Sequence, residues 1–319
     1  MKINENIERH REKGKRTTAP WKYAGSLAVV LAVFLIISFS VFQQLGNAPA
    51  GDEGTRDETP VPVEEAKEKE LAVEDVEKFL PENAVLAKAR HPENVQAVQR
   101  ADLDKDGIRE VVATYEIKAE EEPGPSTAGV IVIKKKAEKW EKVWEKEAQG
   151  AGLDFALLVD VTGDGTEELL FGVTIGASAG NQLEIFQWKS DKFAPMTEMF
   201  YHELEIVSNG KTGLAFWDRF MADAYIVNVA SWNGTEFMYD KELYEKYYPA
   251  VQAYYEEKLA RMDAWFYWYA LADAQMKADS LEKAKSSIEK GIELARKEQI
   301  TDAAESLERL KSELEKKGQ

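Results

Sequence analysis

The stretch ADLDKDGIREVVATYEI, residues 101–117, decides the fold expected for the first half of the folded chain. Acidic side chains crowd its beginning: Asp102, Asp104, Asp106 and Glu110. Gly107 permits a sharp turn, and the β-branched and aromatic residues from Val111 onward are typical of a strand. We therefore expect an acidic loop that leads directly into a β-hairpin.

A bound calcium ion would explain this crowding, because calcium takes six to eight oxygen ligands and four unpaired carboxylates would otherwise repel one another. An EF-hand does not fit, since its twelfth position would be Ala113 and the flanking sequence is β-rich. A shorter ligand set is expected: Asp102, Asp104, Asp106, the carbonyl of Ile108, and Glu110. The alternative is an acidic hairpin turn without metal.

A second copy of the pattern occurs in DVTGDGTEELLFG, residues 160–172, and is again followed by strand residues. Its expected ligands occupy the corresponding positions: Asp160, Thr162, Asp164, Thr166 and Glu168. Thr162 stands where the first copy has an aspartate, so we expect the second loop to bind metal more weakly. A turn without metal stays open as the alternative here too.

Both segments resemble the calcium loops of FG-GAP or VCBS-type repeats, which are found in β-propellers that include the integrin α-subunit head. The resemblance implies that the loop residues bind calcium structurally and take no part in catalysis. It extends over each loop and its adjoining strands.

Three further segments are expected to form hairpins: residues 129–145, 183–196 and 224–240. Each has an apolar strand, a polar turn, and an aromatic residue that opens the return strand. These aromatic residues are Trp140, Phe193 and Phe237. The pattern predicts three blade-like units in residues 73–239, the third without an acidic loop. Since complete propellers have at least four blades, we expect a partial propeller or an irregular β-sandwich.

Residues 240–319 change to helical spacing of apolar residues and predict four helices, over 241–262, 263–278, 279–298 and 302–317. Asp279 with Glu282, and Asp302 with Glu305, have the spacing of capping boxes.

The middle helices resemble a tetratricopeptide repeat at six positions: Trp268, Leu271, Ala272, Ala284, Ile288 and Gly291. Gln275 and Arg296 depart from its usual aromatic and proline. The resemblance therefore covers one degenerate repeat, which cannot form a solenoid alone. It implies a helical module for protein contacts.

Four neighbouring aromatic residues are candidates for binding a partner: Trp265, Phe266, Trp268 and Tyr269. Core packing is the alternative, because large aromatic side chains are mostly buried.

An apolar segment near the N-terminus predicts a membrane anchor. Nineteen uncharged residues, 24–42, match a bilayer core of about 30 Å, and we place the transmembrane helix at 23–43. Residues 1–22 hold seven Lys/Arg against three Asp/Glu, which puts this tail in the cytoplasm and the bulk of the chain outside the cell. The alternatives are a signal peptide cleaved after Ala50 and a buried core helix. Residues 44–72 predict an acidic, flexible linker.

Charge and composition exclude several classes of site. The formal net charge of −17 makes nucleic-acid binding unfavourable, and the lack of cysteine excludes disulfides, thiolate zinc sites and cysteine nucleophiles. Residues 176–180, GASAG, match a hydrolase serine motif, but a strand is expected after Ser178 where that motif needs a helix. His202 has no orienting partner evident in the sequence.

The sequence thus predicts an α+β multidomain protein with one transmembrane helix, antiparallel hairpin repeats and a helical C-terminal region. We expect a non-enzymatic protein of the cell membrane, of Gram-positive type, that binds calcium and contacts an unidentified protein. Two alternatives stay open. One is a cell-wall or carbohydrate binder that uses Trp217, Trp232 and the aromatic residues of the helices, and the other is a metal-dependent hydrolase.

Overall fold

The computed structural model describes residues 70–118 and 125–318. Residues 1–22, the predicted transmembrane helix at 23–43 and nearly all of the linker at 44–72 lie outside the described residues. Within the two described ranges, no helix combines the length and apolar character that crossing a membrane requires. The sheets and helices from Leu71 onward belong to one compact unit.

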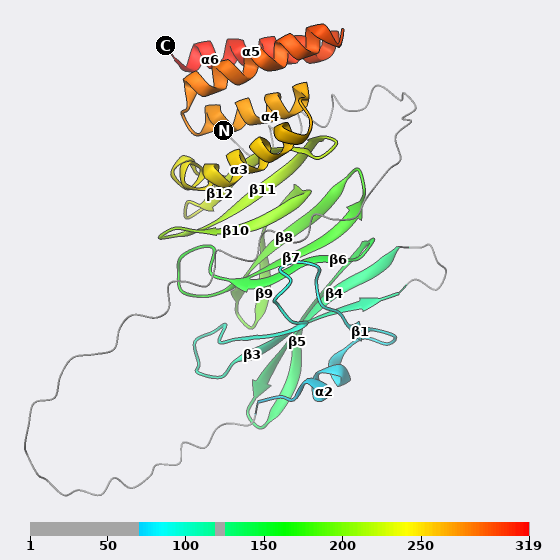
Figure 1. Ribbon diagram of the computed structural model, residues 1–319. Coiled ribbons are helices and arrows are strands. Elements are labelled where there is room, and N and C mark those ends of the chain that lie inside the picture. Colours follow the sequence, from blue (N-terminus) through cyan, green and yellow to red (C-terminus); the bar gives the residue numbers. More distant parts are fainter. Residues whose placement is uncertain (1–69, 119–124, 319) are drawn as a thin grey trace, which may run out of the picture. The chain divides into compact units, whose positions relative to one another are not determined.

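Figure 1 shows that strands make up the first part of this unit and helices the last part. The first sheet is preceded by α2 (Val73–Val76) and the short 3-10 helix η1 (Glu77–Phe79), and it contains β1 (Val85–Leu86), β2 (Val98–Ala101), β3 (Glu110–Ile117), β4 (Ser126–Lys136) and β5 (Lys139–Gly150). The second contains β6 (Leu153–Val159), β7 (Glu168–Gly176), β8 (Gly180–Lys189) and β9 (Lys192–Tyr201). The third contains β10 (Glu203–Ser208), β11 (Thr212–Met221), β12 (Ala224–Trp232) and β13 (Phe237–Tyr239).

All three sheets are antiparallel, and within each sheet consecutive strands are paired except β1 and β2, which both pair with β3. The predicted hairpins correspond to β4–β5, β8–β9 and β12–β13, and the two acidic loops connect β2 to β3 and β6 to β7. The expected α+β class, with antiparallel sheets followed by C-terminal helices, is confirmed.

The sheets pack face to face in the order of the sequence. Val112, Leu169 and Phe171 belong to an apolar cluster between the first and second sheets, and Leu183 and Phe216 to one between the second and third. A further cluster lies between α2 and the outer face of the first sheet. Both faces of the central strands are therefore covered, which explains why β3, β4 and β7 are nearly continuous apolar runs instead of alternating.

A glycine in the second sheet makes room for a tyrosine that crosses it. A Cβ atom on Gly172 would collide with the hydroxyl group of Tyr201. The Tyr201 hydroxyl donates a 2.6 Å hydrogen bond to the Asp154 carboxylate, and both residues are buried. This pair joins the two edge strands of the sheet, β6 and β9, across its face.

Four helices follow, as predicted: α3 (Lys241–Arg261), α4 (Trp265–Lys277), α5 (Leu281–Lys297) and α6 (Thr301–Lys317). Asp240 caps α3, because its side chain accepts a 3.0 Å hydrogen bond from the backbone N–H of Leu243. The helices α3 and α4 share an apolar cluster with the third sheet, and α4, α5 and α6 share another.

Both predicted capping boxes are wrong. Asp279 has a φ of +53°, one residue before the N-cap of α5, and its carboxylate pairs with Lys241 and Lys317. Asp302 lies within the first turn of α6, which begins at Thr301. Asp279, in the turn between α4 and α5, is thus bound by lysines of α3 and α6 and does not cap α5.

Candidate metal-binding loops

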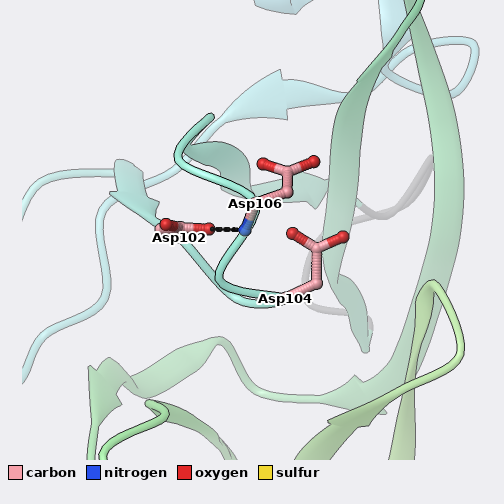
Figure 2. A group of neighbouring side chains, drawn as sticks. All are labelled: Asp102, Asp104 and Asp106. Carbon is pink, nitrogen blue, oxygen red and sulfur yellow. Dashed lines mark hydrogen bonds between the residues drawn. The ribbon is translucent and has the colours of Figure 1, made fainter.

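The loop between β2 and β3 is held in shape by its own aspartates. The two carboxylate oxygens of Asp102 accept hydrogen bonds from the backbone N–H groups of Asp106 and Gly107, each at 3.0 Å. Asp106 in turn accepts one from Ile108 N at 2.8 Å. Gly107 has a φ of +89°, which glycine adopts without strain. Figure 2 shows Asp102, Asp104 and Asp106 extending from this one loop.

These three aspartates lie close enough to share one ion. Each of Asp102, Asp104 and Asp106 offers a carboxylate oxygen within 4.8 Å of the other two. Two oxygens bound to one calcium ion lie at most about 5.2 Å apart, twice the longest usual Ca–O distance. With the carbonyl of Ile108 as the expected fourth ligand, the chemistry and spacing of this loop fit calcium.

Glu110, the expected ninth-position ligand, has a different place. Its side chain is 1% exposed and accepts a 2.9 Å hydrogen bond from the backbone N–H of Leu103. Burial raises the pKa of the Glu110 carboxyl to about 7. The side chain folds under the loop and is not part of the group formed by the three aspartates, and its role as a metal ligand stays a prediction.

A lysine outside the first loop, Lys134 on β4, brings a positive charge to the carboxylates of the loop. Its ammonium group contacts Asp104, lies 2.8 Å from Asp191 Oδ1 and lies 3.8 Å from Glu110 Oε1. A buried lysine therefore supplies part of the counter-charge, and the expectation that a metal offsets the repulsion of these carboxylates stays a prediction. Burial alone would lower the pKa of Lys134, but its bonds to Asp104 and Asp191 outweigh burial and raise it.

The loop between β6 and β7 repeats the same hydrogen-bond pattern. Asp160 accepts from the backbone N–H groups of Gly163 and Gly165 at 2.6 and 2.9 Å, and Asp164 accepts from Thr166 N at 2.8 Å. The first loop leads into β3 and the second leads into β7. The structure thus supports the equivalence of the two segments that the sequence pattern suggested.

The second loop has fewer groups free to bind an ion. Glu168 is fully buried and accepts from Val161 N at 3.0 Å, and burial raises its pKa to about 7. The hydroxyl of Thr162 donates to the same Glu168 carboxylate at 3.2 Å. This leaves Asp160, Asp164 and the carbonyl of Thr166, a weaker set than that of the first loop.

The two loops also touch each other. The ammonium group of Lys105 in the first loop donates to the backbone carbonyl of Asp164 in the second, at 3.3 Å. Asp191, in the turn between β8 and β9, reaches Lys134 from the second sheet. The two loops are therefore joined by a direct hydrogen bond, and the two sheets by the Lys134–Asp191 pair.

Sequence reasoning missed Lys134 and Asp191. Val111 pairs with Ile133, so the preceding residue Glu110 stands opposite Lys134 at the mouth of the loop. Counting the β3–β4 hairpin in register would have placed this lysine, but the length of the connection between the two strands hides that register.

The four aromatic partner-binding candidates lie mainly inside the helical region. Trp265 is buried, and Tyr269 is half-buried with its ring stacked on Phe220 at a centroid distance of 4.8 Å. Phe266 and Trp268 are half-buried, and Trp268 Nε1 donates to Asp263. Their packing matches the core alternative, and a role of their exposed edges in partner binding stays a prediction.

The two tryptophans proposed to bind carbohydrate, Trp217 and Trp232, also make contacts within the protein. Trp217 is 5% exposed, and its indole N–H donates a 2.9 Å hydrogen bond to the Tyr247 hydroxyl. Trp232 is half-buried and packs on Phe237 at 5.3 Å. Trp217 presents no open ring face for stacking on a sugar.

The GASAG motif lies in the hairpin turn between β7 and β8, where Gly176 pairs with Gly180. A strand follows Ser178, as the sequence predicted, so the strand-to-helix turn of a serine hydrolase is not formed. His202 does have an orienting partner, contrary to expectation, because its Nδ1 lies 3.1 Å from Asp218 Oδ1. The backbone N–H of Arg219 lies 3.1 Å from the same nitrogen, so the tautomer decides whether Nδ1 donates to Asp218 or accepts from Arg219.

Comparison with known proteins finds no family model and no curated protein that matches the chain.

Proposed function

We propose that this chain is a non-enzymatic, membrane-anchored extracytoplasmic protein that displays calcium-stabilised sheets and a helical region for protein contacts. The observation that carries the proposal is the repeated loop geometry. In both loops, a first-position aspartate accepts two backbone N–H groups, and a fifth-position aspartate accepts one. In the first loop three carboxylates converge within 4.8 Å.

Calcium bound by Asp102, Asp104 and Asp106 would neutralise their charge and tie the start of the loop to its end. Calcium concentrations outside cells suit the weak affinities of extracellular modules, with Kd values of about 0.1–1 mM. The second loop, with Thr162 in place of an aspartate, would bind more weakly. In this proposal the metal stabilises structure and takes part in no reaction.

The three stacked antiparallel sheets, one of five strands and two of four, support a partial, propeller-like arrangement of blades. The close approach of α4, α5 and α6 supports the tetratricopeptide-like assignment of the helical region. A Cβ atom on Gly291 would lie 2.9 Å from Leu307 Cδ2 and 3.3 Å from Trp268 Cβ, so a larger residue at this position would require the Leu307 side chain to shift. The membrane anchor rests on the apolar sequence of residues 23–43 and its basic flank.

Two experiments test the proposal. Calcium titration of the purified full-length chain by calorimetry is expected to give a dissociation constant in the range of about 0.1–1 mM, lost in an Asp102→Asn, Asp106→Asn variant. Affinity capture from intact cells, with and without calcium, is expected to recover a protein partner through the helical region. The absence of calcium binding at 10 mM would contradict the metal assignment.

A further inference from the structure

Lys134 contacts the first loop although a metal-binding loop needs no lysine. It comes from the end of β4, on the strand next to the loop, and its side chain is only 10% exposed. A lysine is rarely this buried unless it is paired. Its three partners are all carboxylates: Asp104, Glu110 and Asp191.

The second sheet provides an internal comparison. Leu169 pairs with Phe186, so Gln187 stands opposite Glu168 as Lys134 stands opposite Glu110. Gln187 donates a 3.2 Å hydrogen bond to Asp164 Oδ2. At equivalent positions, a charged side chain therefore contacts the first loop and a neutral amide contacts the second.

We propose that Lys134 is the built-in counter-ion of the first loop, which holds the loop in shape without metal and competes with calcium for Asp104. The ammonium group contacts one of the three carboxylates that would bind the ion. It also places a positive charge beside the site, which opposes the approach of a divalent cation. The competition with calcium rests on the proposed function, whereas the counter-ion role does not.

The residue also links the two sheets. Asp191 belongs to the β8–β9 turn, and its bond to Lys134 lowers the pKa of its carboxyl. When calcium draws Asp104 away from Lys134, Asp191 remains as the partner of the ammonium group. Calcium binding would then exchange one contact of Lys134 and keep the other.

The test compares Lys134→Gln, which installs the residue of the second sheet, with Lys136→Gln. Lys136 is a matched control because it carries the same charge and lies 3.8 Å from Asp191, but it is 45% exposed and does not contact Asp104. Two readouts are measured on the full-length chain: the melting temperature in EDTA and the calcium dissociation constant by calorimetry. Lys134→Arg, which keeps the charge, is expected to behave more like the wild type.

We expect Lys134→Gln to melt several degrees lower than Lys136→Gln in EDTA, and to bind calcium about tenfold more tightly than the wild type. Adding Asp104→Asn to Lys134→Gln should recover melting temperature in EDTA, because it removes the carboxylate left unpaired. If Lys134→Gln alone folds poorly, the melting temperature of this double variant in EDTA still tests the counter-ion role.

The two proposals fail in different ways. If the wild type binds calcium and Lys134→Gln binds it equally well with an unchanged EDTA melt, the counter-ion role is overturned. If no variant binds calcium but Lys134→Gln alone melts early in EDTA, the calcium proposal is overturned and the counter-ion role stands.

Discussion

Asp102 is the side chain on which the first loop depends most, and its removal gives a quantitative prediction. Its carboxylate accepts two hydrogen bonds from loop backbone N–H groups, each at 3.0 Å. The loop is exposed, so each hydrogen bond to the Asp102 carboxylate should add only about 0.5–1 kcal/mol to the free energy of unfolding, the low end of what hydrogen bonds contribute to protein stability. Asp102→Ala should therefore lower the free energy of unfolding by about 1–2 kcal/mol in EDTA. For a unit of this size the melting temperature should fall by about 2–8 °C.

Calcium adds a second component to the same prediction. A ligand at 10 mM with a Kd of about 0.1–1 mM stabilises the folded state by about 1.4–2.7 kcal/mol. Asp102→Ala should lose most of this increment, so the difference between variant and wild type should widen when calcium replaces EDTA. Asp102→Asn, which keeps one acceptor oxygen, should lose less stability in EDTA but should still lose the calcium increment.

The assay is thermal unfolding followed by circular dichroism, in EDTA and in 10 mM calcium. Glu138→Ala is the control, because it removes a carboxylate from the exposed β4–β5 turn without altering the first loop. Equal melting temperatures for Asp102→Ala and Glu138→Ala under both conditions would refute the reasoning.

Three further variants probe the framework around the loops. Tyr201→Phe leaves the buried carboxylate of Asp154 without its donor, so a loss of about 2–4 kcal/mol is expected in chemical denaturation, and a loss below 0.5 kcal/mol would count against this pair. Gly172→Ala should destabilise by about 1–3 kcal/mol in the same assay because the methyl group collides with Tyr201, and a neutral result would show that the ring is not fixed there. Burial alone would raise the pKa of Asp240, but its bonds to Leu243 N, Lys211 and Ser231 outweigh burial and lower it. The stability that Asp240 contributes is present above its unfolded pKa of about 3.9 and lost as pH falls through its lower folded pKa. Asp240→Asn should therefore flatten the fall in stability below pH 4, and an unchanged acid profile would contradict this role.

Much of the fold could be predicted from local sequence. The three turn-bounded hairpins were recognisable because each has an apolar strand, a polar turn and an opening aromatic residue, and the four helices because apolar spacing changes after Asp240. The capping-box prediction was wrong because the spacing of residue types does not determine where a helix begins. The N-caps of α5 and α6 are Ser280 and Ile300. Asp279 has the right spacing to Glu282, yet the lysines of two other helices hold its carboxylate. Such long-range pairing leaves no local signal.

The candidate site also has a part that the sequence could predict and a part that it could not. The loop aspartates and their glycines could be predicted, since their hydrogen bonds lie within a few residues of one another. The inward turn of Glu110 and Glu168 could not, because it depends on the core beneath each loop. Nor could Lys134, which reaches the first loop only after β3 and β4 pair.

A crystal structure determined in 10 mM calcium, with anomalous data, tests the central claim most directly. We predict a peak bound by oxygens of Asp102, Asp104 and Asp106 at about 2.3–2.6 Å, and a weaker peak or none between Asp160 and Asp164. A first loop that keeps Asp104 on Lys134 and holds no peak at that concentration would contradict the account.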